Sequence, residues 1–210
     1  MIQIINWSKT PLSPDYRGSG SFATFMIIGA TCFFLGILFA SFPYDFPLLW
    51  SAAPVPDSYY DILETHLRWM HQSPPLISRV LNIITTVGFL GLAIKLYRPA
   101  VLNFLFDGAS LILYFIGWAI WVRSIVKRLR LVSWGHWPEE EDGVTVSRKD
   151  NVKLLAISNT ILALVLVGVL VLQVSQWYAE AKEIQDLKMS DNHNDSSPER
   201  KASGSNKKRQ

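Results

Sequence analysis

Cysteine is almost absent from this sequence, because Cys32 is the single one among 210 residues. One cysteine excludes an intramolecular disulfide, a Cys-x-x-Cys redox pair and a zinc site built on several thiolates. We interpret Cys32 as a small thiol packed within a helix. The sequence contains no stretch of alternating basic and aromatic residues that would indicate nucleic acid as a partner. The class of protein is indicated by its apolar segments.

Charge is missing altogether from residues 22–42, which read FATFMIIGATCFFLGILFASF. About 20 apolar residues in a helix span the ~30 Å hydrocarbon core of a bilayer. A helix of a soluble protein would have a polar face, and this segment has none. We expect Pro43 to end the helix, Tyr44 to lie at the membrane interface and Asp45 to remain in water.

Three further apolar runs follow, at about 76–94, 101–122 and 154–176. Helices satisfy their own backbone groups in lipid, whereas open strands do not. The predicted fold class is therefore an all-α membrane protein. It has four transmembrane helices, a short amphipathic helix in the first loop and a disordered C-terminal tail.

The segments outside these runs are too short for an independent soluble domain. We divide the chain into a flexible head (1–21), a four-helix membrane domain (22–178) and a polar tail (179–210). The tail buries too little apolar surface to fold, and we expect disorder from about Met189. Any active site would have to lie between the helices or at their mouths.

The loop 43–75 contains a predicted amphipathic helix of about 13 residues, ended by Pro74-Pro75. Its apolar residues recur at helical spacing, and Ser58 with Asp61 resembles a capping box. Two placements are equally open: along the membrane surface, or packed over the bundle. The apolar residues at this spacing are Tyr59, Leu63, Leu67 and Met70.

Two other classes of function compete, a small transporter or channel and a membrane enzyme. No acidic residue lies at the middle of a span, which argues against proton-coupled transport. An enzyme would need converging polar groups, and His66 and His71 are five residues apart, a poor spacing for metal ligation. We therefore predict no cofactor and no metal. The enzyme candidates on this loop are Asp45, Asp57, Asp61, Glu64, His66 and His71.

Polar residues inside the spans are functional candidates by default. Asn82 and Asn159 either bond to one another across two helices or face a partner helix. Arg79 and Asp107 lie near span ends on opposite sides of the membrane, so we expect them not to pair. Small residues that permit close helix packing are Gly29, Gly36, Ala40, Gly88, Gly91, Gly117, Ala156 and Ala163.

The C-terminus suggests which side of the membrane is cytosolic. Lys207 and Lys208 are the fourth and third residues from the end, and they resemble the dilysine retrieval signal of endoplasmic-reticulum membrane proteins. With four spans, both termini are then cytosolic. The basic loop 123–153 argues against this orientation by the positive-inside rule. Glycan attached at the sequons of Asn6 or Asn194 would overturn the orientation.

Four short motifs occur in order: PYD at 43–45, YYD with ETH at 59–66, FDGASL at 106–111 and SNTIL at 158–162. Together they resemble the fungal packaging chaperones of amino-acid permeases, the super-high-histidine-resistance family of the endoplasmic reticulum. The resemblance covers about residues 22–178.

This resemblance implies a multi-pass chaperone without enzymatic activity. It would keep new amino-acid permeases from aggregating and assist their packaging into COPII-coated export vesicles, with the tail meeting the coat and the helices meeting lipid and client. The candidates for client contact are then Asn82, Asn159 and Thr160.

Overall fold

The computed structural model describes residues 16–52, 54–97, 101–135, 139–141 and 144–195. One compact unit ends at Val174, and a second begins at Ser175. The described elements are α1 (Tyr16–Leu49), α2 (Asp57–His71), α3 (Pro75–Leu96), α4 (Val101–Ile120), η1 (Trp121–Val126), α5 (Lys127–Trp134), β1 (Glu139–Glu141), β2 (Val144–Val146) and α6 (Arg148–Asp195).

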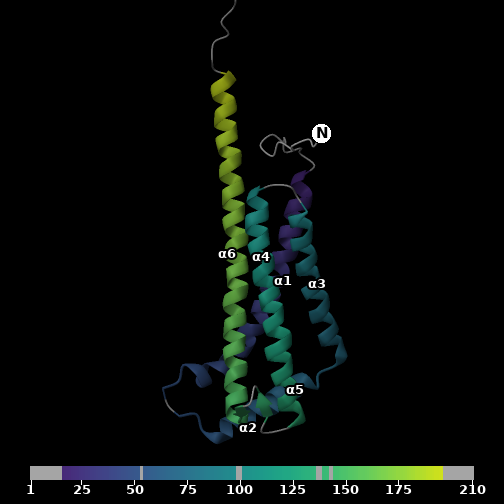
Figure 1. Ribbon diagram of the computed structural model, residues 1–210, viewed down its shortest axis with the longest axis vertical. Coiled ribbons are helices and arrows are strands. Elements are labelled where there is room, and N and C mark those ends of the chain that lie inside the picture. Colours follow the sequence, from purple (N-terminus) through teal and green to yellow (C-terminus); the bar gives the residue numbers. More distant parts are fainter. Residues whose placement is uncertain (1–15, 53, 98–100, 136–138, 142–143, 196–210) are drawn as a thin grey trace, which may run out of the picture. The chain divides into compact units, whose positions relative to one another are not determined.

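Four helical segments are long and apolar enough to cross a membrane: Ser21–Leu49, Pro75–Leu96, Phe104–Trp134 and Arg148–Lys182. The predicted fold class is confirmed, with α2 as the amphipathic helix of the first loop. The third segment is composite, because the π-helix η1 joins α4 to α5 without a break. Within the first unit the helices run alongside one another, and α2 and α5 lie at the same end (Figure 1).

The first helix does not end at Pro43, as the sequence suggested. α1 continues for six more residues and contains both Pro43 and Pro47. Each proline removes one backbone hydrogen bond, but a helix that stays in apolar surroundings still satisfies more backbone groups than an unwound chain. The prediction for Asp45 was wrong as well, because this side chain lies on the helix and is only 7% exposed.

Close helix contacts form at three of the predicted glycines. A Cβ on Gly91 would lie 2.9 Å from the carbonyl oxygen of Ala23, so only glycine lets α3 approach α1 there. Gly88 faces the Tyr114 ring, and Gly117 lets Leu162 of α6 approach α4. Gly29 and Gly36 meet nothing within 4 Å. Cys32, predicted to be packed, is exposed on α1.

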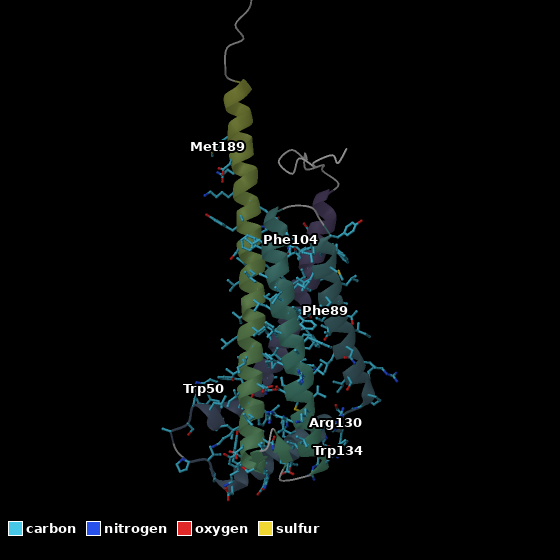
Figure 2. The ribbon with its side chains drawn as sticks, viewed as in Figure 1. Trp50, Phe89, Phe104, Arg130, Trp134 and Met189 are labelled. Atoms are coloured by element: carbon cyan, nitrogen blue, oxygen red, sulfur yellow. The ribbon has the colours of Figure 1, made fainter. Side chains whose placement is uncertain are left out.

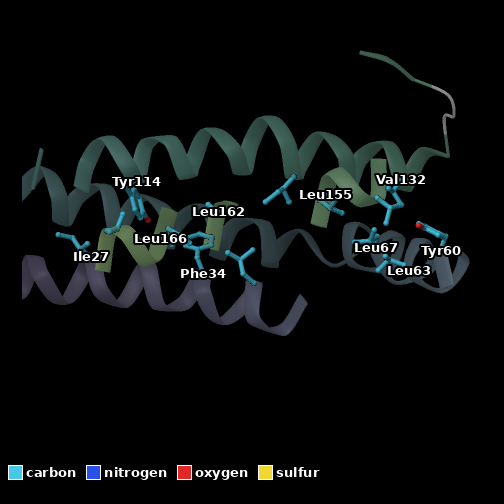
Figure 3. Packing of buried hydrophobic residues seen from close by; sticks show 14 of the residues in the cluster. Ile27, Phe34, Tyr60, Leu63, Leu67, Tyr114, Val132, Leu155, Leu162 and Leu166 are labelled. Atoms are coloured by element: carbon cyan, nitrogen blue, oxygen red, sulfur yellow. The ribbon is translucent and has the colours of Figure 1, made fainter. Parts of the chain in front are cut away.

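The buried apolar side chains form one cluster that runs through the bundle and continues under α2 (Figure 3). In the bundle it includes Phe34 and Leu162, and at the α2 end it includes Leu63 and Val132. Since the apolar face of α2 packs against α5, the structure favours packing over the bundle for this helix. The expected capping box is not formed: Pro56 precedes α2 without a side-chain cap.

Two features of the chain were not expected. Residues 139–146 include an antiparallel strand pair, in which Glu140 faces Thr145. α6 continues to Asp195, beyond Met189, where composition predicted disorder to begin. Most of the predicted head and the retrieval candidates Lys207 and Lys208 lie outside the described residues.

Candidate functional site

The first turns of α3 are unpacked and carry two polar residues. Every residue from Pro74 to Val80 is exposed, including Ser78 and Arg79. Asn82 and Thr86 are exposed further along the same helix. The Thr86 hydroxyl donates to the backbone oxygen of Asn82 at 2.8 Å, while the Asn82 amide has no hydrogen-bond partner among the described side chains.

Asn159 has a different environment from Asn82, and the two do not bond to one another. Its Nδ2 donates to Oδ2 of Asp45 at 2.9 Å, which ties α6 to the proline-containing end of α1. Thr160 donates its hydroxyl to the Ala156 backbone oxygen at 3.0 Å. Of the three client-contact candidates, Asn82 is therefore the exposed one with an unused amide; the other two are half-buried.

The end of α1 is also connected to α2. The Tyr59 hydroxyl donates to the backbone oxygen of Tyr44 at 2.8 Å. The Tyr44 and His66 rings stack, with centroids 4.2 Å apart and planes 17° apart. Burial, with a smaller effect from Asp45, raises the pKa of Tyr59 above its usual value, so this hydroxyl keeps its proton at neutral pH.

Ion pairs hold α2 to the first turn of α6. Arg148 pairs with Asp61 and, through Nε, with Glu64 at 2.7 Å. Lys149 pairs with Asp57, and its hydrogen bond, followed by its charge, lowers the pKa of that carboxyl below the usual range. The two loops that carry these partners thus lie at the same end of the bundle.

Several of the acidic and histidine side chains that are enzyme candidates in the first loop take part in these contacts. Asp57, Asp61 and Glu64 face basic partners, and His66 faces an aromatic ring. In the described part of the chain, no three His, Cys, Asp or Glu residues are grouped to hold a metal ion. Asp57, Asp61 and Glu64 therefore form a tether between α2 and α6.

A second polar cluster lies inside the bundle, where α3 ends and α4 begins. Lys95 Nζ lies 3.2 Å from Oδ1 of Asp107 and donates to Oε1 of Gln173 at 2.8 Å. Gln173 Nε2 in turn contacts Asp107 at 3.3 Å and Ser110 Oγ at 3.0 Å. All four residues are buried, and Asp107 and Ser110 are 0% exposed.

Sequence reasoning missed this cluster. It placed Asp107 near the end of a span and did not connect it with Lys95. The available signal was the pair of opposite charges on either side of a short connection, since antiparallel helices joined by a few residues bring such positions together. As expected, Arg79 does not pair with Asp107 in the structure; it is exposed on α3.

Basic residues gather on η1 and α5 at the α2 end. Arg123, Lys127 and Arg130 are exposed, and Arg130 lies over the Trp134 ring at 5.7 Å (Figure 2). Arg128 donates to Oδ1 of Asn151 at 3.0 Å. This arrangement of basic and aromatic side chains is typical of a helix end at the level of the lipid headgroups.

Comparison with protein families identifies a match over most of the chain. Residues 18–210 match the model of the SHR3 chaperone family, whose description is ER membrane protein SH3. No curated protein and no solved structure matches the chain.

Proposed function

This chain belongs to the SHR3 chaperone family of endoplasmic-reticulum membrane proteins, and from that premise we propose that its clients are newly made amino-acid permeases. The family is one of chaperones and not of enzymes, and the four long apolar helices make the chain a multi-pass membrane protein. In the proposal, the chaperone shields permease helices until they fold and then assists their packaging into coated export vesicles.

The exposed amide of Asn82 is the observation that supports client binding. A carboxamide in hydrocarbon is costly unless it forms hydrogen bonds. The polar substrate-binding groups of a permease helix are costly in the same way until the other helices of the permease have packed against it. When the permease helix contacts α3, its polar groups and the amide of Asn82 form hydrogen bonds with one another. Hydrogen bonds between helices in lipid average only about 0.6 kcal/mol, so the client dissociates without nucleotide hydrolysis.

Co-isolation of permeases tests this proposal. The full-length chaperone and the variant Asn82→Leu are purified from endoplasmic-reticulum membranes in mild detergent, and bound permeases are quantified by mass spectrometry. Loss of one hydrogen bond predicts roughly a 3-fold to 20-fold decrease in bound permease, with the chaperone itself equally abundant. Ile83→Leu, which changes the exposed neighbouring residue but no polar group, is the matched control. Equal permease recovery with Asn82→Leu would refute this mechanism.

The orientation and export steps are part of the proposal. Both termini lie in the cytosol, where the polar tail meets the vesicle coat and Lys207-Lys208 returns escaped molecules to the endoplasmic reticulum. The α2–α6 ion pairs support an even number of crossings between the two loops, because they bring both loops to one end of the bundle. Glycan on Asn6 would refute the orientation, and unchanged localisation of a Lys207→Ser, Lys208→Ser variant would refute retrieval.

A further inference from the structure

We propose that the exposed face of α3 selects membrane helices that carry a carboxylate, with Arg79 as the group that binds it. This inference rests on the proposed function, since it specifies which chemistry in a client helix is recognised. The recognition face consists of Ser78, Arg79, Asn82 and Thr86, all exposed.

The spacing of these residues places them on one side of the helix. Positions three or four apart lie one turn apart on the same face of an α-helix. Arg79 and Asn82 are separated by about 4.5 Å along the axis, and Thr86 lies about 6 Å beyond Asn82. A second helix lying against α3 would meet the guanidinium first and the amide one turn deeper.

The charge of Arg79 points to an acidic partner. α3 contains no aspartate or glutamate. The carboxylates described elsewhere in the first unit have other partners: Asp107 pairs with Lys95, and those of α2 pair with Arg148 and Lys149. No described carboxylate pairs with Arg79. A guanidinium matches a carboxylate in bidentate geometry, which gives both strength and orientation.

A lipid phosphate satisfies Arg79 alone, because an arginine near a helix end extends toward the headgroups. The lipid phosphate does not reach the amide of Asn82, because this amide lies one turn deeper, at a depth where the lipid is hydrocarbon only. A client helix with a carboxylate and a second polar group one turn away satisfies both residues at once. The unpacked first turns of α3, from Pro74 to Val80, leave room for such a helix.

Photo-crosslinking to designed helices tests the selectivity. A photo-activatable residue replaces Ile83, which is 62% exposed and one turn from Arg79. The full-length chain is reconstituted in phosphatidylcholine vesicles with leucine–alanine transmembrane helices that carry Glu, Gln, Lys or Leu at the depth of Arg79. We expect the Glu helix to be captured about 10-fold more than the Leu helix, and the Gln helix to be intermediate.

Substitutions at Arg79 complete the test. Arg79→Gln should reduce capture of the Glu helix to the level of the Gln helix, and Arg79→Glu should shift the preference to the Lys helix. Arg123→Gln, which removes an exposed arginine from η1, is the matched control and should leave capture unchanged. Equal capture of all four helices, or unchanged capture of the Glu helix by Arg79→Gln, overturns the inference.

The two proposals fail separately. If designed helices show no preference for Glu while Asn82→Leu still loses permeases, carboxylate selectivity is wrong and the client class stands. If no permease co-isolates with the wild-type chain while the Glu helix is captured, the face is selective and the client class is wrong.

Discussion

Removal of one charge from the buried Lys95–Asp107 pair should destabilise the bundle strongly, while removal of both charges should not. At 3.2 Å the two charges attract one another by about 5 kcal/mol at an effective dielectric constant of about 20. The cost of burying both charges offsets most of that attraction. The net contribution of the pair to the free energy of unfolding is therefore small, but each charge is stabilised in the interior by the other.

The magnitudes follow from burial. Lys95→Met removes the ammonium that lies beside the carboxylate of Asp107, which is 0% exposed, and Asp107→Asn removes the carboxylate that lies beside the ammonium of Lys95, which is 6% exposed. Breaking a buried pair from one side costs about 3–5 kcal/mol. The double variant keeps an amide at position 107 that still accepts from Gln173, so we expect it to lie within about 1 kcal/mol of the wild type.

Unfolding by SDS in mixed micelles, followed by tryptophan fluorescence, measures all four proteins and closes a double-mutant cycle. With about 3–5 kcal/mol for each single variant and at most about 1 kcal/mol for the double variant, the expected coupling energy is at least about 5 kcal/mol. If the two single variants simply add in the double variant, the pair does not act as a unit and the reasoning is wrong. A thermal-stability assay in mild detergent provides an independent ranking of the same proteins.

Three further outcomes follow from the structure. Gly91→Ala places a Cβ against a backbone oxygen of α1 and should destabilise by about 1–3 kcal/mol; Gly29→Ala, in open space, should stabilise by roughly 0.5–1 kcal/mol, so that thermal unfolding of the two variants moves in opposite directions. Asn159→Leu removes the donor to a buried carboxylate and should lower the amount of folded chaperone in a fluorescence size-exclusion assay, unlike Asn82→Leu. Lys149 lowers the pKa of Asp57, so their ion pair is complete above about pH 4 and is lost as the pH falls through the lowered pKa. Cleavage of α2 by an acid-stable protease should therefore rise only below about pH 4, and the same rise near neutral pH would contradict the assignment.

Hydropathy predicted the four spans because a helix in lipid has to be apolar over a fixed length. It could not locate the end of α1. The rule that proline ends a helix applies where water accepts the freed carbonyl, whereas α1 continues through Pro43 and Pro47 within a segment apolar enough to cross a membrane. Asp45 was therefore assigned to water when it in fact lies against Asn159 of α6.

The sequence predicted which residues are candidates for the site, but not which of them is exposed and which is bonded within the bundle. Asn82 and Asn159 are alike in sequence, since each is the single asparagine of its apolar run. Which of them is exposed depends on how each helix is rotated against its neighbours, and that depends on contacts such as Gly91 against α1. The opposite charges of Lys95 and Asp107 on either side of a short connection could have indicated their pairing, but no local pattern indicated that Gln173 of α6 joins them.

The tether between α2 and α6 has a consequence for the order of events during synthesis. Asp57 and its partner Lys149 are 92 residues apart in the chain. At about 5–20 residues per second, roughly 5–20 seconds separate their emergence from the ribosome. Throughout that interval the carboxylates of α2 lack their cations and the first spans lack α6. The chaperone is thus itself an unfinished membrane protein for seconds, until α6 has followed the earlier spans.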